Sequence, residues 1–352
     1  MNRSGPDPSA SAAWRARSRH RGAVLAAALL VLGVLALVDL TTGPSGLTVR
    51  ELWQTAIAGP AGADRAAAAI LFQIRLPQTA MSLIVGGALG LAGLMMQTIL
   101  ANPLASPFTL GFSAAAGFGA ALALMFGTTL ALPVPDWLLT PACAFAATLV
   151  ATLLVWTVSR LKGGAPEILV LAGIAVLFFF QSLQSLVQFM ASPEVLQQIV
   201  FWLFGSLLKA NWTAVKVSAA IVALCLPFIA RETWALTTLR MGEANAESLG
   251  LDTHTLRRRV FLITAALTAA AVSFTGTIGF VGLIAPHVAR AMVGEDHRYA
   301  LPLSAVTGAV ILASASVAAK LLSTGAAIPV GIVTAIAGIP MLALVILNHK
   351  ES

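Results

Sequence analysis

The sequence has few charged side chains and almost no cysteine. Only 10% of its 352 residues are Asp, Glu, Lys or Arg and 58% are hydrophobic, whereas soluble domains are about a quarter charged. This composition excludes a soluble globular enzyme, and the high hydrophobicity also excludes a disordered chain. The two cysteines, Cys143 and Cys225, lie in apolar runs and are expected to be small core residues, not a disulfide scaffold. An integral membrane protein remains.

Motifs of two energy-coupling mechanisms are also missing. No G-x-x-x-x-G-K-[ST] segment occurs, so this chain does not bind ATP through a P-loop. The carboxylates nearest the apolar stretches fall at their ends: Asp39, Asp136, Glu167 and Glu194. Ion-coupled carriers usually keep an ionisable group at mid-membrane, so the pattern disfavours an ion-coupled secondary transporter, which stays as the alternative of a different class.

Residues for catalysis and metal binding are scarce as well. The five histidines have no partner at metal-ligand spacing, so we expect no metal site and no cofactor bound by this chain. The segment Gly111-Phe112-Ser113-Ala114, with His287 as a base, partly matches an intramembrane serine protease, but the nucleophile motif is incomplete and we expect no catalytic residue. The net charge is +7, but the sequence has no basic run interleaved with aromatic residues. This argues against a nucleic-acid partner.

Long charge-free stretches predict an all-α membrane protein with about ten transmembrane helices. A helix needs roughly 20 apolar residues to cross the hydrocarbon core of a bilayer. Glycine and proline place the breaks between consecutive spans. The predicted spans are 22–38, two within 76–135, 138–159, 168–193, 217–230, two within 260–289, 299–319 and 321–349.

The distribution of Lys and Arg predicts the orientation of these spans. With both termini in the cytoplasm, 15 of the 21 Lys and Arg residues fall on the cytoplasmic side, as the positive-inside rule requires. We therefore expect a basic cytoplasmic tail over residues 1–21. A single transmembrane domain is expected over 22–350, and its longest cytoplasmic loop over 231–259.

Several polar residues lie inside the predicted spans. Gln181, Gln184 and Gln188 are spaced at i, i+3 and i+7 and share one helix face. A glutamine facing lipid would leave its amide unsatisfied, so this face lines either a translocation pathway or an interhelical hydrogen-bonded contact. Gln97 and Asn102, at the end of the second span, are open to the same two interpretations.

The loop 231–259 has the pattern of a compact helical knob. Glu243 and Glu247 are one helical turn apart, and Gly250 is suited to end that helix. Asp252 is suited to cap a second short helix carrying His254, Arg257 and Arg258. The knob is either a docking element for an energy-supplying partner or an ordinary solvated loop, and we favour docking.

From about Ile74 to the C-terminus, the order and spacing of these motifs resemble one family. The chain is similar to the permease subunits of ABC importers for iron–siderophores, haem and vitamin B12, the FecCD-type or type II importers. The residues that carry the resemblance are Arg75-Leu76-Pro77, Gly86-Gly87-Ala88-Leu89, Gln97, Asn102-Pro103-Leu104-Ala105-Ser106-Pro107, Gly111, Gly242-Glu243, Leu249-Gly250-Leu251, the run Gly279 to Arg290, Asp296-His297-Arg298, Leu301-Pro302, the run Ile328 to Ala335, and Gly338-Ile339-Pro340.

The resemblance implies a ten-helix type II permease that works as a homodimer in the cytoplasmic (inner) membrane of a bacterium. Two cytoplasmic ATP-binding subunits, which hold ATP and Mg²⁺, and a periplasmic or surface-anchored substrate-binding protein complete the importer. The implied cargo is a ferric siderophore or similar metal chelate, with haem and cobalamin as alternatives. Hydrolysis belongs to the partner, so the chain itself is a transport subunit and not an enzyme.

The resemblance also assigns residues to the two docking faces. The ATPase-coupling residues would be Gly242, Glu243, Ala246, Glu247, Leu249, Gly250 and Leu251. On the outer face, Arg75 and Lys320 would meet acidic residues of the binding protein. The sequence departs from the family pattern at Gln78, where a second arginine is common, and at Ser316, where an aspartate is common.

Overall fold

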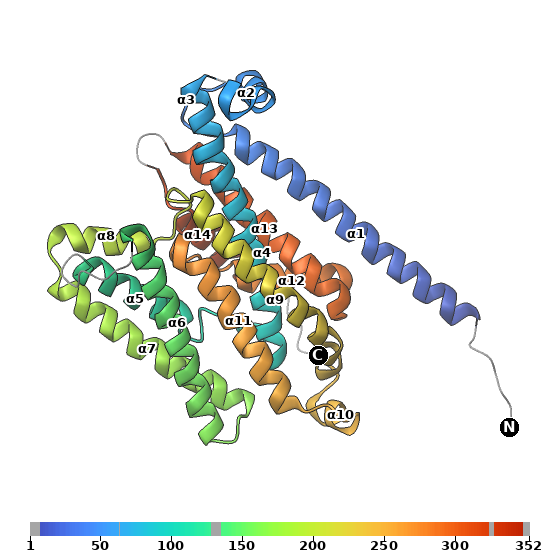
Figure 1. Cartoon of the computed structure of the whole chain (residues 1–352). Helices are drawn as coiled ribbons and strands as arrows, with labels where there is room; N and C mark the ends of the chain where they lie inside the picture. Colours follow the sequence, from blue (N-terminus) through green and yellow to red (C-terminus); the bar gives the residue numbers. More distant parts are fainter. Residues whose placement is uncertain (1–7, 63, 128–134, 324–326, 348–352) are drawn as a thin grey trace, which may run out of the picture.

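A computed structural model describes residues 8–62, 64–127, 135–323 and 327–347, and within them every regular element is helical (Figure 1). Seven helices are long and apolar enough to cross a membrane, and three shorter apolar helices accompany them. The predicted all-helical architecture of about ten spans is confirmed. The ten helices are α1 (Pro8–Thr41), α4 (Leu76–Ile99), α5 (Phe112–Phe126), α6 (Asp136–Leu161), α7 (Pro166–Met190), α9 (Trp212–Leu239), α11 (Thr253–Thr275), α12 (Val281–Val293), α13 (His297–Leu322) and α14 (Val330–Leu347).

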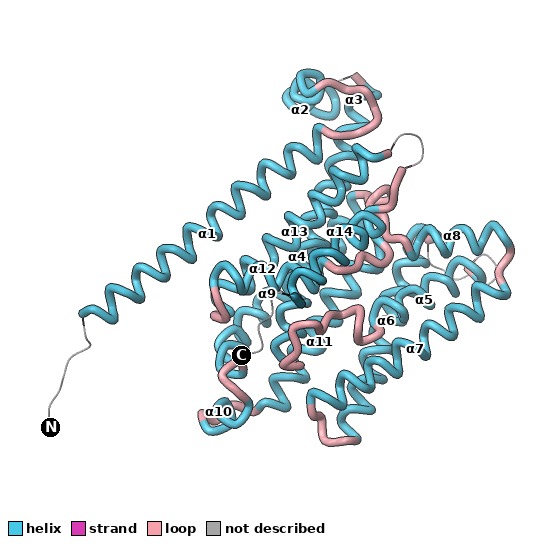
Figure 2. The backbone as a smooth tube through the Cα atoms, turned by 180° about the vertical axis from the view of Figure 1, so that it is seen from behind, coloured by secondary structure: helices cyan, strands magenta, loops and turns pink. Residues whose placement is uncertain are grey.

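Short helices close the two ends of this bundle. At one end, α2 (Val49–Gly62) and α3 (Arg65–Ala68) lead through the π-helix η1 (Ala69–Arg75) into α4. The amphipathic α8 (Pro193–Leu203) follows α7, and α10 (Glu243–Ser248) lies at the opposite end of the bundle (Figures 1 and 2).

Glycines let α4 and α13 pack backbone to backbone at the centre of the molecule. A Cβ at Gly86 would lie 2.5 Å from the carbonyl oxygen of Gly308, and one at Gly90 would collide with the carbonyl of Ser304. The Ser304 hydroxyl donates to the Gly90 carbonyl at 2.7 Å, which fixes the register of the two helices. Small residues allow this close approach in membrane proteins, where van der Waals contact drives helix association.

The helix α1 lies along one flank of the bundle, next to α13, and exposes much of its apolar surface (Figure 1). Helices α5, α6, α7 and α8 form a group on the other flank. Exposed leucines such as Leu30 and Leu37 on α1 would be unfavourable in water, and a lipid environment accommodates them.

Within the predicted cytoplasmic loop 231–259, α9 continues to Leu239 and α11 begins at Thr253. The expected second short helix is therefore the first turn of the long α11. Asp252 does cap it, accepting a hydrogen bond from the Thr255 amide at 3.0 Å. The last span also begins later than predicted, at Val330.

Candidate functional site

The helix α10 forms a compact knob between α9 and α11. Gly242 and Gly250 border it with φ angles of 107° and 83°, a left-handed region that suits glycine. Ala246 is fully buried, whereas Met241 and Leu249 on either side are 66% and 71% exposed. The knob thus combines an anchored inner face with an exposed apolar surface.

A buried arginine braces the knob from inside. Arg257 on α11 pairs through Nη2 with Glu243 Oε2 at 2.6 Å, and its Nε donates to the Ile99 carbonyl at 3.3 Å. The hydrogen bond from Arg257 is the main cause that holds the pKa of Glu243 below its usual value. One side chain therefore joins α10, α11 and the C-terminal end of α4.

The second glutamate of the knob has a different partner. The Thr253 hydroxyl lies 3.0 Å from Glu247 Oε1 and 3.2 Å from Glu243 Oε1. Both glutamates therefore face the start of α11, but only Glu243 reaches the buried arginine. The sequence predicted the shared face of the glutamates and not the role of Arg257.

A second ionic cluster lies at the same end of the bundle. Arg240, after α9, binds both carboxylate oxygens of Glu295 at 2.8 and 3.0 Å. Arg290 of α12 lies 3.7 Å from the same carboxylate and also donates to Gln97 Oε1 on α4. Gln97 is only 2% exposed, so its amide is used in helix-to-helix bonding.

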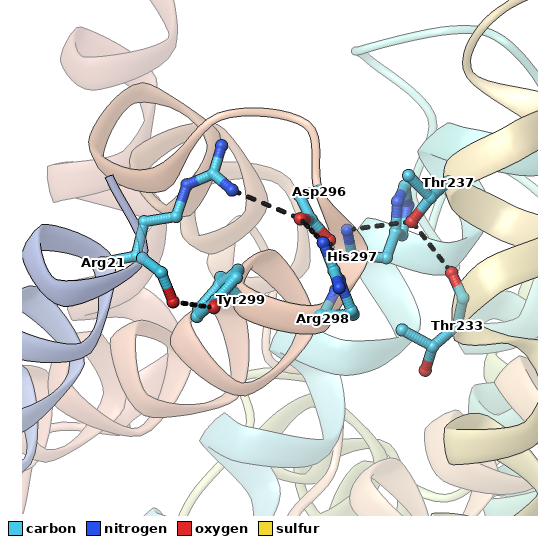
Figure 3. A network of polar contacts seen from close by, with 8 residues as sticks. Arg21, Thr233, Thr237, Asp296, His297, Arg298 and Tyr299 are labelled. Carbon is cyan, nitrogen blue, oxygen red and sulfur yellow. Dashed lines mark hydrogen bonds and ion pairs between the residues drawn. The ribbon is translucent and has the colours of Figure 1, made fainter. Parts of the chain in front are cut away.

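The start of α13 continues this cluster toward α1 (Figure 3). Asp296 accepts from Arg298 at 2.7 Å and from Arg21 of α1 at 3.2 Å. The His297 amide donates to the Thr237 hydroxyl of α9 at 3.1 Å. Helices α1, α9 and α13 are therefore tied together near the knob.

At the other end of the bundle, the two predicted docking cations point into the protein. Arg75 is 3% exposed, and its guanidinium donates to the carbonyls of Leu40 and Thr41 and to the Ser45 hydroxyl. It thereby satisfies the free carbonyls at the C-terminus of α1. Docking by Arg75 stays a prediction, while the structure gives the side chain an internal partner.

Lys320 also has a partner inside the protein. Its Nζ lies 2.8 Å from Asp39 Oδ1, and Asp39 is fully buried. Thr79 of α4 donates to the other oxygen of Asp39 at 2.5 Å. The carboxylate partner of Lys320 is thus supplied by α1, a contact that sequence spacing does not reveal.

The remaining predicted pathway residues are spread over the fold. Asn102 caps a turn through a 2.9 Å hydrogen bond from the Leu104 amide. Gln184 packs against α5, because a Cβ at Gly117 would collide with its Oε1. Gln181 is exposed and Gln188 half-buried on α7. Their role in a pathway stays a prediction.

A cavity of about 520 Å³ lies where α12 and α14 meet the loops after α4, α8 and α11. Phe280, which has a φ of 67°, begins α12 at its wall, and its ring packs where a Cβ on Gly338 would collide. None of the lining residues is charged; they are Leu89, Ser106, Pro107, Phe108, Thr109, Leu203, Phe204, Thr277, Gly279, Phe280, Gly282, Leu283, Gly331, Ile332, Ala335, Ile336 and Ile339. The predicted glutamines are not among them.

The serine-protease alternative finds no support in the described residues. Ser113 Oγ is buried and has no hydrogen-bond partner among them, so no serine–histidine pair forms there. Ser113 lies in the first turn of α5, next to Gly111, which packs against α7.

The ten apolar helices, the braced knob and the uncharged cavity define a multi-pass membrane permease. The chain belongs to the FecCD transport family, whose sequence profile matches residues 29–348. The profile covers nearly all of the described helices.

Named relatives agree with this membership. The chain is 32% identical to the hemin transport system permease protein HmuU of Yersinia pestis, over 92% of this chain and 95% of the relative. It is 34% identical to the iron(3+)-hydroxamate import system permease protein FhuB of Bacillus subtilis, over 93% and 83%. The cobalamin import permease BtuC of Halobacterium salinarum is also 34% identical, over 82% and 76%.

A solved structure shares the fold over 93% of this chain. It is described as a metal-chelate type ABC transporter in an inward-facing conformation. The TM-score is 0.81 at 29% identity, with 93% of this chain and 99% of that chain covered. The predicted permease fold is therefore confirmed.

Proposed function

We propose that this chain is the membrane-spanning subunit of an ATP-driven importer that carries a ferric siderophore or a similar metal chelate. It works as a homodimer with two ATP-binding subunits and a substrate-binding protein. ATP and Mg²⁺ act in the ATP-binding subunits, and this chain holds no cofactor and supplies no catalytic residue. The observation that carries the proposal is the knob α10, which presents exposed Met241 and Leu249 on a base braced by Arg257.

The contacts of Arg257 with Glu243 and the Ile99 carbonyl, here called the brace, suit the knob to transmit movement. An isolated six-residue helix is marginally stable in water, so α10 depends on its tertiary contacts. Arg257 joins it to α11 and to the end of α4, and α4 packs against α13 at the centre of the bundle. A push on α10 therefore reaches the helices that surround the uncharged cavity, as alternating access requires.

The charge pattern supports a cytoplasmic position for the knob end. Arg21, Arg240, Arg257, Arg290 and Arg298 all gather in the ionic contacts near α10. Basic residues concentrate on the cytoplasmic side of multi-pass membrane proteins. We therefore place both termini in the cytoplasm and the chain in the inner membrane of a bacterium.

The uncharged cavity suits a bulky chelate whose metal charge is covered by its ligands. A ferric siderophore is our first cargo, in line with the hydroxamate permease among the relatives. Haem is the second candidate, because the hemin permease aligns over 95% of its length. Cobalamin is the third, on the same kind of likeness.

Co-purification tests the assembly. The chain is expressed with the ATP-binding and substrate-binding proteins encoded beside it, and the purified membrane complex is weighed by native mass spectrometry. We expect two copies of this chain with two ATP-binding subunits. A chain that binds no ATP-binding subunit and transports on an ion gradient alone would instead support the secondary-transporter alternative.

A further inference from the structure

A second cavity, of about 330 Å³, lies at the knob end of the bundle, between the α6–α7 turn and the first turns of α11. Its walls contain two arginines and a histidine and no acidic residue. The lining residues are Trp156, Arg160, Gly163, Gly164, His254, Thr255 and Arg258. None of them belongs to the knob or to the uncharged cavity.

The arginines of this cavity lack counterions. In the run 257–259, Arg257 pairs inward with Glu243, and Arg259 pairs with Glu232 at 3.2 Å. The side chain of Arg258, between them, lines the cavity and makes no ion pair or hydrogen bond within the described part of the chain. The same holds for the side chain of Arg160 on α6. Two like charges therefore share a cavity without an acidic partner among the described residues.

Nearby carboxylates are already occupied. Glu243 and Asp252 are two carboxylates near His254. Glu243 is held by Arg257 at 2.6 Å, and Asp252 caps α11 through the Thr255 amide. The cavity thus keeps a positive charge that an external anion would neutralise.

The backbone fixes the shape of this cavity. Gly163 and Gly164 adopt φ angles of 89° and 72° in the turn after α6. A Cβ on Gly164 would lie 2.8 Å from the ring of His254, so the turn rests directly on that ring. The position therefore requires glycine both for its φ angle and for the close approach.

We propose that this cavity binds the phosphate of an anionic phospholipid from the cytoplasmic leaflet. The guanidinium groups of Arg160 and Arg258 match the donors that phosphate oxygens prefer. Trp156 on the wall is a residue type that favours the headgroup level of a membrane. The proposal rests on the proposed function in one respect, the cytoplasmic position of the knob end.

A bound headgroup would bridge two elements that are otherwise joined by few polar contacts. Arg160 closes α6, and Arg258 lies on α11 next to the brace residue Arg257. The phosphate would hold the α6–α7 turn against the base of the knob. The membrane would thereby stabilise the segment that transmits movement from α10.

Lipid retention tests the site directly. The complex is purified in detergent, supplied with phosphatidylglycerol or phosphatidylcholine, and examined by native mass spectrometry and thermal unfolding. We expect retention of phosphatidylglycerol and not of phosphatidylcholine. Arg160→Gln and Arg258→Gln should each weaken retention about five-fold, since one basic side chain contributes about 1 kcal/mol toward an anionic lipid surface.

The matched control is Arg259→Gln, on the same helix but paired with Glu232. It should retain the lipid as the unsubstituted chain does. Equal retention by all three variants would overturn the site, while an intact co-purified complex would leave the proposed function standing.

Two further experiments test other anions as occupants of the cavity. Sodium phosphate at millimolar concentration, without lipid, should give no stabilisation, and a full stabilisation would mean a free-phosphate site and overturn the lipid assignment. In the second experiment, this chain is purified without its partners and loaded with the lipid, and the ATP-binding subunits are then added, which should leave the lipid in place. Its displacement, together with loss of subunit binding in Arg258→Gln, would mean that the cavity receives an acidic side chain of that subunit.

Discussion

Arg257 Nη2 lies 2.6 Å from Glu243 Oε2, which ties the first turn of α10 to a buried cation on α11. The same guanidinium donates to the Ile99 carbonyl, where α4 ends. The side chain of Arg257 is almost completely buried, whereas that of Glu243 is partly exposed. This contact makes the knob an extension of the helical bundle and not a loosely attached loop.

The brace predicts different effects for the two glutamates of α10. Glu243→Gln leaves Arg257 buried without a counterion, and breaking such a pair costs about 3 kcal/mol. We expect a lower thermal unfolding midpoint and weaker stimulation of ATPase activity by the binding protein. Glu247→Gln is the matched control, one turn away and without contact to Arg257. Equal effects of the two substitutions would contradict the brace.

The pKa of Glu243 gives this contact a pH dependence. Because Arg257 lowers the pKa of the folded carboxyl, the stabilisation is fully present above the usual pKa of 4.5 and is lost as pH falls through the lowered value. Thermal unfolding of the chain and of Glu243→Gln should therefore differ by a constant amount from pH 6 to 8. The difference should shrink only in more acidic buffer, and a difference that vanished near pH 7 would refute the assignment.

The exposed apolar surface of the knob predicts a specific loss of assembly. Leu249→Asp should abolish binding of the ATP-binding subunits without lowering the unfolding midpoint, because the side chain is 71% exposed. Leu208→Asp, at an exposed leucine before α9 at the other end of the bundle, is the control and should assemble normally. Pull-down from detergent measures both. A Leu249→Asp chain that still binds the subunits would show that the knob is not their docking surface.

The buried pair at the opposite end predicts a rescue. Asp39→Asn leaves Lys320 as an unpaired cation inside the bundle, a change that costs about 3–5 kcal/mol. Adding Lys320→Met removes that cation, so the double variant should recover most of the lost stability. Thermal unfolding in detergent measures each step. A double variant as unstable as Asp39→Asn would contradict the pairing.

Substitution of Arg75 distinguishes a contact with the substrate-binding protein from a stabilising contact inside this chain. Because its guanidinium binds the end of α1, Arg75→Gln should lower the unfolding midpoint. Arg50→Gln, at an exposed position on α2, should not. Binding of the substrate-binding protein is measured at low and high salt alongside. A salt-dependent binding defect with an unchanged midpoint would show that Arg75 meets the partner directly.

Much of the helical layout is readable from sequence because charge-free length and helix-breaking residues are local signals. The break between α11 and α12 follows from Gly276 and Gly279, and the close approach at Gly86 and Gly90 from their small size. The amphipathic α8 was not predicted; it lies between the predicted spans 168–193 and 217–230. Its Ser192 cap, which accepts from the Val195 amide, was a local signal available for it.

The candidate site was less predictable because its contacts join distant segments. Asp39 and Lys320 are 281 positions apart, and no spacing rule connects them. Arg257 was expected on a second short helix of the knob and lies instead on the long α11, where its burial depends on the end of α4, which sequence does not position. The uncharged cavity combines residues from five separate stretches, and no sequence pattern predicted that they meet.

The proposed function requires this chain to move a metal chelate inward when its partners hydrolyse ATP. Reconstituted into liposomes with the ATP-binding subunits, and with ATP inside, it is offered the substrate-binding protein and radiolabelled ferric siderophore, haem or cobalamin outside. We expect accumulation of ferric siderophore that stops without ATP or without the binding protein, and that fails in Leu249→Asp. Uptake that needs only an ion gradient, or no uptake of any of the three, would contradict the account.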